Sequence, residues 1–414
     1  MQLRVCSLAL SVEDAMIPSL RQLYNETFTE QKYTRFLDHI TGLFQYKPVF
    51  RIAETPVFIS KELEGHLFKA CDLINEVICS SAFKEQSGKS LHPSYLVPGD
   101  EKNPVFINMD FALTRDQNGE LLPKLIEIQG FPSLYFYQDA VANAYRKFFT
   151  IPEGYSHLFG GLNSSTYLEM LRNVVIGDLP VENVILLEID PNRQTTRIDF
   201  LVAHAMIGIP VVCISKLKKE GNILYYISEK GRRTRVHRIF NRVIFDELVR
   251  RPDIKSQFSF TDPGDIEWIG HPNWFFRISK YSLPFLKNEY VPETWFLSDL
   301  ETIPDDLNEY VLKPLFSFSG TGVVYRVNRE ILEKTADPYN YILQRKVHYE
   351  PVIQTPGEPA KCEIRMLLLW EPGTEKPIIV NNLARLSKGD MIGVQFNKDK
   401  EWVGGSVGFF DVEC

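Results

Sequence analysis

The spacing of apolar residues divides the chain into a helical first part and a mixed remainder. Residues 12–90 carry apolar side chains three and four positions apart, a pattern typical of amphipathic helices. Ser60 stands directly before one of these runs and is expected to cap its helix. Residues 104–113 and 122–131 instead predict two strands, and the Asn-Gly pair between them predicts a β-hairpin.

The order of elements changes in the middle of the chain. We expect helices near 134–150 and 164–174, and then a strand at 182–190, a helix at 195–208 and a strand at 209–215. That order is typical of a βαβ unit in a parallel sheet. A hairpin is expected within 222–243, where we interpret the basic run 230–238 as a solvated hairpin rather than a polyanion site. A short helix at 245–252 and later strands at 341–347, 362–370, 376–387 and 402–410 complete the prediction.

Composition narrows the class of protein. The 414 residues, 44% hydrophobic and 24% charged, suit a globular chain with two or three structural units. A net charge of -7 argues against a general nucleic-acid binder. Six scattered cysteines without a CxxC pair favour reduced thiols and a cytoplasmic location. Neither a membrane span nor a histidine-based zinc site is expected from the sequence.

The stretch VLKPLFSFSGTGVVY places a lysine, Lys313, between a strand and a glycine-rich turn. Its ammonium group would attract phosphate oxygens, and glycines let backbone N–H groups approach them. An exposed lysine on an ordinary hairpin is the alternative for this stretch taken alone.

The predicted hairpin at 104–131 carries candidate metal ligands. Glu127 and Gln129 are two positions apart and share a strand face, which Asp110 can reach from the paired strand. Two carboxylates and an amide oxygen form a site suited to Mg²⁺. On a later strand Glu363 and Arg365 also share a face, and an ion pair between them is the alternative to a role in the site.

Taken in order, these motifs resemble the circularly permuted ATP-grasp ligases, the family that includes eukaryotic-type glutathione synthetase and glutathionylspermidine synthetase. The resemblance covers roughly residues 100–414, through MDFALTRDQNGELLPKLIEIQG, the βαβ segment, FFRISKYSLPFL, YVLKPLFSFSGTGVVY, YILQRKV and CEIRMLLLW. It implies a mixed α/β ATP-grasp fold with an inserted βαβ region. The implied regions are an N-terminal helical region (1–100), the metal-binding hairpin with helices (101–180), a βαβ substrate-binding region (181–262) and a nucleotide-binding region with a lid loop (263–414).

The resemblance also implies roles for individual residues. Asp110, Glu127 and Gln129 would be the metal ligands. Nucleotide contacts would come from Lys280, Lys313, Ser319, Gly320, Gly322, Gln344 and Lys346. Arg365 and Arg385 would be catalytic, and substrate contacts would come from Ser133, Glu188, Asn192, Gln194, Asn241 and Lys388.

Some positions depart from the family pattern. Ser317 and Ser319 stand in the lid loop, where the family has an acidic metal ligand. Asn108 and Asn241 occupy positions where the family has arginines, although Arg242 is adjacent. These differences argue against glutathione as the substrate.

The implied activity is ATP- and Mg²⁺-dependent joining of a small-molecule carboxylate to an amine, peptide-like substrates included, through an acylphosphate. Neither nucleic acid nor a membrane is an expected partner, and a homodimer is left open. A phosphotransferase on the same fold is one alternative. A degenerate nucleotide-binding protein without catalytic activity is the other.

Overall fold

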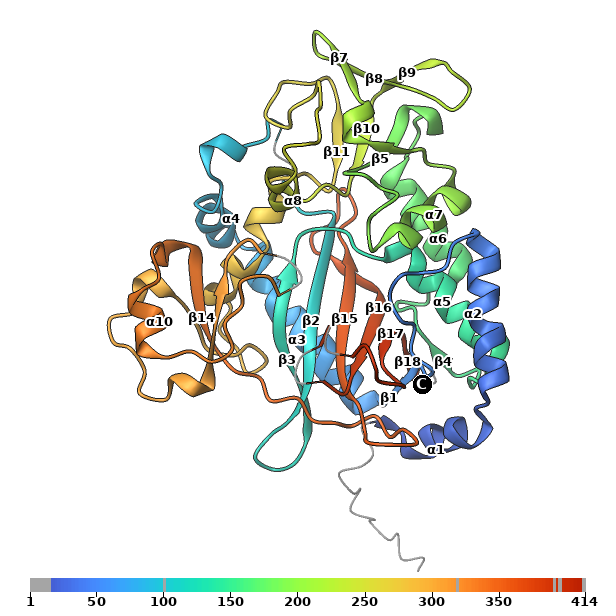
Figure 1. Cartoon of the computed structure of the whole chain (residues 1–414), viewed down its shortest axis with the longest axis vertical. Coiled ribbons are helices and arrows are strands. Elements are labelled where there is room, and N and C mark those ends of the chain that lie inside the picture. The colour runs from blue at the N-terminus through green and yellow to red at the C-terminus, as the bar shows by residue number, and fades with distance from the viewer. Residues whose placement is uncertain (1–15, 100–101, 318–319, 390–391, 394–396, 412–414) are drawn as a thin grey trace, which may run out of the picture.

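The computed structural model describes residues 16–99, 102–317, 320–389, 392–393 and 397–411 (Figure 1). Its first part contains the helices α1 (Pro18–Thr27), α2 (Glu30–Phe44), α3 (Lys61–Cys79) and α4 (Ser81–Gly88). Ser60 caps α3 by accepting a hydrogen bond from the Leu63 N–H group at 3.3 Å. The helical prediction for 12–90 is therefore confirmed where the structure describes it, with the short strand β1 (Val57–Ile59) as an addition.

A five-stranded antiparallel sheet runs through the middle of the molecule (Figure 1). Its order is β17 (Gly404–Ser406), β16 (Ile378–Ser387), β15 (Lys361–Leu369), β2 (Phe106–Arg115) and β3 (Leu121–Gln129). The predicted hairpin is β2–β3. In its turn the Asp116 carboxylate accepts hydrogen bonds from the N–H groups of Asn118 (2.9 Å) and Glu120 (2.8 Å).

Alternation along β2 places Ile107, Met109 and Phe111 on one face of this sheet and Asn108 and Asp110 on the other. Ile107, Met109 and Phe111 are buried in the same core cluster as Leu63 and Leu67 of α3. The intervening side chains point to the opposite side, because successive residues of a strand alternate between faces. The face away from α3 is therefore where the charged residues of these strands collect.

A four-stranded parallel sheet follows in the chain, in the order β11 (Glu267–Ile269), β10 (Arg238–Asn241), β5 (Val184–Glu188) and β6 (Val211–Cys213). Helix α7 (Arg197–Ile207) connects β5 to β6, so the predicted βαβ unit is present. One expectation needs correction. The hairpin predicted within 222–243 is limited to β8 (Ile223–Ile227) and β9 (Arg233–Val236), which join β7 (Lys218–Glu220), while β10 enters the parallel sheet.

A smaller lobe contains the strand that carries Lys313. It contains the sheet β12 (Thr294–Phe296), β14 (Tyr341–Arg345) and β13 (Tyr310–Pro314), next to α10 (Arg329–Glu333) at the left of Figure 1. The remaining strands and α-helices are β4 (Tyr155–Ser156), β18 (Gly408–Asp411), α5 (Tyr135–Phe148), α6 (Ser164–Val175), α8 (Phe245–Arg250) and α9 (Trp274–Arg277), and the 3-10 turn η5 (Lys280–Phe285) follows α9. Among the helices in the described ranges, none has the length and apolar character needed to cross a membrane.

Gly130 lets the end of β3 approach α9 and the residues just before η5. Its N–H group donates to the Ile278 carbonyl at 2.8 Å. A Cβ at this position would lie 2.7 Å from the Trp274 carbonyl oxygen and 2.9 Å from Ile278 Cβ. The absence of a side chain therefore brings Lys280, two residues further on, against the hairpin.

We expect Gly130→Ala to lower the free energy of unfolding by about 1–3 kcal/mol, as overpacking of a close contact does. The control is Gly65→Ala in α3, where an added Cβ meets nothing within 4 Å. That change should be neutral or stabilise the helix by up to about 1 kcal/mol. Urea unfolding of both variants checks the prediction, and equal stability of the two would contradict it.

Candidate active site

The polar face of the central sheet brings together charged residues from four strands. Asp110 on β2 lies opposite Glu127 on β3 and opposite Arg365 on β15, and Glu363 on β15 lies opposite Arg385 on β16. Directly opposed residues of an antiparallel pair point to the same side of the sheet. These five side chains therefore share one face, as the pairing of Asp110 with Glu127 across the hairpin and the two-residue spacing of Glu363 and Arg365 predict.

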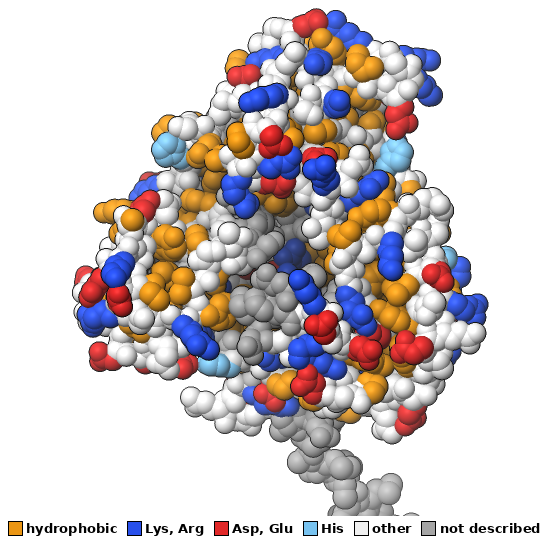
Figure 2. All heavy atoms as spheres, viewed as in Figure 1, with side chains coloured by type: hydrophobic (Ala, Val, Ile, Leu, Met, Phe, Trp, Pro, Cys, Tyr) orange, Lys and Arg blue, Asp and Glu red, His pale blue; other side chains and the backbone are white. Residues whose placement is uncertain are grey.

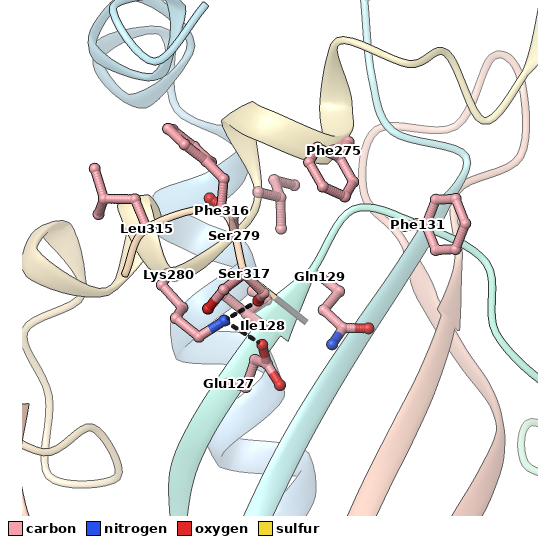
Figure 3. Close-up of a pocket in the computed structure, with 11 residues that line it drawn as sticks. Glu127, Ile128, Gln129, Phe131, Phe275, Ser279, Lys280, Leu315, Phe316 and Ser317 are labelled. Atoms are coloured by element: carbon pink, nitrogen blue, oxygen red, sulfur yellow. Dashed lines mark hydrogen bonds and ion pairs between the residues drawn. The ribbon is translucent and has the colours of Figure 1, made fainter. Parts of the chain in front are cut away.

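Lys280 connects η5 to the hairpin (Figure 3). Its Nζ lies 2.9 Å from Glu127 Oε1 and donates to the Ser317 carbonyl oxygen at 2.5 Å. Burial alone would raise the pKa of Glu127, but the ammonium groups of Lys280, which also donates a hydrogen bond, and of Lys313 together hold that pKa below its usual value. A recess beside this pair is closed on its apolar side by the rings of Phe275 and Phe316.

Lys313 reaches the same strand from β13. Its Nζ donates to the Ile126 carbonyl oxygen at 3.2 Å and to Gln344 Oε1 at 2.6 Å. Burial lowers the pKa of Lys313 to about 8, which Glu127 partly opposes. An anion bound beside this lysine would favour its charged form. Two lysines from separate segments thus converge on residues 126–127.

Asp110 is the centre of a buried ion network. Its Oδ1 accepts from Arg365 Nε at 2.5 Å, and its Oδ2 accepts from Arg365 Nη2 and Arg385 Nη2, both at 2.7 Å. Arg385 also pairs with Glu363, which accepts from the Tyr349 hydroxyl at 3.0 Å. Burial would raise the pKa of Asp110, but the two arginines keep it low. The sequence left open an ion pair between Arg365 and Glu363. In the structure Arg365 pairs with Asp110 instead.

This network includes Asp110, which the sequence predicts as a metal ligand. Both oxygens of Asp110 accept hydrogen bonds from arginines, whereas Glu127 and Gln129 lie together at the recess. In the part of the chain that the structure describes, no three His, Cys, Asp or Glu side chains form a metal-binding group. A carboxylate and an amide fit Mg²⁺ when a ligand supplies further oxygens, since Mg²⁺ is commonly held by one or two carboxylates plus phosphates.

Four of the predicted substrate residues, Glu188, Asn192, Gln194 and Asn241, lie at or just after the carboxyl ends of the parallel strands β5 and β10. Glu188 is buried at the end of β5, and Gln194 donates at 2.8 Å to both the Ile189 carbonyl and Glu247 Oε1. Asn241 is buried and bonds the backbone of Val243, while Asn192 is exposed and Ser133 half-buried.

The arginine at this edge is Arg242 rather than residue 241. Its guanidinium is buried, contacts the Pro132 carbonyl oxygen and lies 4.0 Å from the Asp199 carboxylate.

Three predicted residues lie away from the lysines or cannot be placed. Lys346 Nζ donates to the Asn308 carbonyl oxygen in the 3-10 turn just before β13. Lys388 lies among Glu358, Glu54 and Lys400. Ser319 lies outside the described residues. Of the predicted loop glycines, Gly320 and Gly322 adopt positive φ angles of 71° and 75°, the region that glycine favours.

Tyr349 and Thr294 belong to the site but were not predicted. Thr294 accepts from Gln344 Nε2 at 3.2 Å, which orients the amide toward Lys313. Tyr349 lies between β14 and β15 in a segment without regular structure, where periodicity gives no signal. Tyr349 contacts the carboxylate of Glu363. Glu363 could be recognised from the sequence, because it lies two positions before Arg365 on a predicted strand.

Burial raises the pKa of Glu188 to about 8, with Arg242 opposing the shift. The folded state then binds a proton that the unfolded chain releases above its usual pKa of 4.5. We therefore expect the contribution of Glu188 to stability to fall by about 1.4 kcal/mol per pH unit between about pH 5 and 8. Urea unfolding of wild type and Glu188→Gln across this range tests it. A difference between the two proteins that stays constant with pH would contradict it.

Figure 2 shows that the molecule is hollowed near the centre of this face, with lysine and arginine side chains around the hollow.

Comparison with known proteins identifies the fold. No protein-family profile and no curated protein sequence matches the chain. The solved structure of a glutathione synthetase-like effector from Globodera pallida, in apo form, aligns with a TM-score of 0.53 at 14% identity, over 93% of this chain and 98% of that one. The chain has a glutathione synthetase-like fold of the ATP-grasp type. A provisionally named gamma-glutamylcysteine synthetase from Methylobacillus flagellatus KT aligns with a TM-score of 0.39 at 13% identity, over 81% of this chain and 85% of that one.

Proposed function

We propose that the protein is an ATP-dependent ligase that joins a carboxylate to an amine, with the circularly permuted order of the family it resembles. The observation that carries the proposal is the meeting of Lys280 and Lys313 on residues 126–127. Two ammonium groups beside a carboxylate and an amide suit a metal-bound triphosphate. The fold is compatible with this chemistry, and the arginine network lies on the same face of the sheet.

The charge of each residue determines which part of the nucleotide or metal it would bind. Lys280 and Lys313 would hold phosphate oxygens, and Gln344 would keep Lys313 oriented. Glu127 and Gln129 would hold Mg²⁺, which neutralises phosphate charge when bound. A substrate carboxylate would then attack the terminal phosphorus to give an acylphosphate and ADP, and the amine would displace phosphate. Holding these like-charged groups together is the main catalytic task of the protein.

The substrate is proposed to differ from glutathione. Asn108 and Asn241 replace two arginines of the family pattern, and the Asn241 amide bonds the Val243 backbone. Arg242 is buried against Asp199 and the Pro132 carbonyl. This edge of the parallel sheet therefore offers less positive charge to carboxylates than the family pattern implies.

Product analysis tests the ligase proposal. Purified protein with Mg²⁺–ATP and mixtures of carboxylates and amines should release ADP and phosphate only when both are present, and mass spectrometry should detect a new amide. A phosphorylated alcohol would instead indicate the phosphotransferase. Nucleotide binding without turnover of any mixture would favour the non-catalytic alternative. The observation that supports this alternative is the lid loop, which has serines where the family has an acidic metal ligand.

A further inference from the structure

Apolar side chains form one wall of the recess beside Lys280 (Figure 3). Phe131, Phe275 and Ile278 line it, and all three are buried. Phe316 lines it from the segment that follows β13 and is half-buried. Of the phenylalanines in this wall, Phe316 is therefore the one with the most freedom to move.

The other wall of the recess is polar and belongs to the proposed phosphate and metal site. Glu127, Gln129 and Lys280 line it. Among the lining residues, all of which lie in the described part of the chain, Lys280 is the only cation. Its Nζ already faces Glu127 Oε1 at 2.9 Å and the Ser317 carbonyl oxygen at 2.5 Å. A group that enters the recess beside the rings therefore meets no second positive charge along the lining.

Arg242 does not change the charge of this lining. Its guanidinium lies over the Phe131 ring, with 5.2 Å between Cζ and the ring centroid, but it is buried against the Pro132 carbonyl and does not line the recess. A carboxylate in the recess would therefore be buried without a counter-charge of its own. Burying an unpaired charge costs far more free energy than burying an apolar group, so the lining favours an uncharged, apolar occupant.

The free space in the recess limits the size of the occupant. It has room for about one water molecule, which is also about the size of a methyl group. A purine base would fit only after a phenylalanine ring had moved. Because the recess shares Glu127 and Lys280 with the proposed phosphate site, a small group inside it would lie next to the phosphates.

We propose that the recess binds the carbon chain of the carboxylate substrate, and that this substrate is a small aliphatic acid without a second carboxylate. In the proposed reaction the substrate carboxylate attacks a phosphate held beside Lys280, so its carbon chain extends from that point. The apolar wall selects an uncharged chain, and Phe316 limits its size. This inference rests on the proposed function and goes beyond it by naming the class of acid.

Hydroxylamine trapping tests the class of acid without knowledge of the amine. The carboxylate oxygen of the acid attacks the terminal phosphorus of Mg²⁺–ATP and displaces ADP. Hydroxylamine then attacks the acyl carbon, and phosphate leaves to give a hydroxamate. The full chain would be tested with propionate, succinate and 3-phenylpropionate, which differ only by a carboxylate or a phenyl ring on the third carbon. We expect kcat/KM for propionate to exceed that for each of the other two by at least about tenfold.

The variant Phe316→Ala tests size selection. Removing this ring leaves space for the ring of 3-phenylpropionate, so the preference for propionate over that acid should fall at least about tenfold. The preference over succinate should remain, because the variant adds no cation. The matched control is Phe285→Ala. Phe285 is also half-buried, but it packs against Phe296 with 5.6 Å between ring centroids and does not line the recess. This control should leave both preferences unchanged.

Calorimetry with Mg²⁺–ATP separates failure of this inference from failure of the proposed function. If wild type neither binds Mg²⁺–ATP nor forms a hydroxamate, both fail. If it binds Mg²⁺–ATP but succinate or 3-phenylpropionate reacts as well as propionate, or none of the three reacts, the inference is overturned while the nucleotide site stands.

The Phe316 variant can overturn the inference in two further ways. Its preference between propionate and 3-phenylpropionate could match that of wild type, in which case the ring does not limit the acid. Its affinity for Mg²⁺–ATP could instead fall more than about tenfold, in which case the recess holds part of the nucleotide. Should Phe316→Ala fail to fold, Phe316→Leu decides, because it removes less of the side chain.

Discussion

Replacing Lys313 with methionine is expected to weaken binding of Mg²⁺–ATP by about 100-fold, the cost of losing a charged hydrogen bond in a buried site. The stability of the free protein should not fall in parallel. Burial lowers the pKa of Lys313 to about 8, so an apolar chain of similar length removes a charge that the fold disfavours. Calorimetric titration with Mg²⁺–ATP and urea unfolding of the same variant measure both quantities.

Lys346→Met is the matched control, because Lys346 was predicted to contact nucleotide but donates to the Asn308 carbonyl instead. We expect its ATP affinity to stay within about threefold of wild type, as for a surface charge. Equal loss of affinity in both variants, or none in Lys313→Met, would contradict the placement of the phosphates.

The lowered pKa of Lys313 also predicts how the free energy of unfolding changes with pH. The pKa of Lys313 is lowered to about 8 in the folded protein from its usual 10.5. Between these values the unfolded chain binds more protons, so this lysine makes the free energy of unfolding rise with pH. The rise should be absent from Lys313→Met.

Asp110→Asn is expected to lower the free energy of unfolding by about 3–5 kcal/mol, because it leaves the buried Arg365 without its counter-charge and the partly exposed Arg385 with less of one. Arg365 has its bidentate partner in Asp110, and Arg385 keeps only Glu363. Urea unfolding near pH 7 measures the loss. The depressed pKa of Asp110 means that its contribution is present above the usual value of 3.8 and is lost only as pH falls below it.

A double-mutant cycle controls this prediction. Removing both charges with Asp110→Asn and Arg365→Gln should recover part of the stability lost in the single variants, since no guanidinium is then stranded. A loss below about 1 kcal/mol for Asp110→Asn would be typical of an exposed pair and would contradict the buried network.

Local pattern was sufficient to predict the strands of the site. Alternation in β2 and the Asn-Gly turn defined the hairpin, and the two-residue spacing of Glu127 and Gln129 placed both at the recess. The strand at Lys313 was equally visible. In each case the signal lies within about ten residues, over which backbone geometry alone orients side chains.

Which distant strands pair, and in which register, could not be predicted from the sequence. Arg365 has Glu363 two residues away, but register across β2 and β15 sets Asp110 directly opposite it. Opposed side chains are closer than same-face neighbours along one strand, so register decides which pair forms. The same holds for β10, whose residues look like the end of a hairpin but join β5 in parallel.

The central claim is that one triphosphate lies between Lys280 and Lys313. The most direct measurement is a crystal structure with Mg²⁺ and a non-hydrolysable ATP analogue. We predict phosphate oxygens at about 3 Å from the Nζ atoms of both lysines, with the metal on Glu127 and Gln129. A bound analogue whose phosphates lie elsewhere, with the Lys280–Glu127 pair untouched, would contradict it.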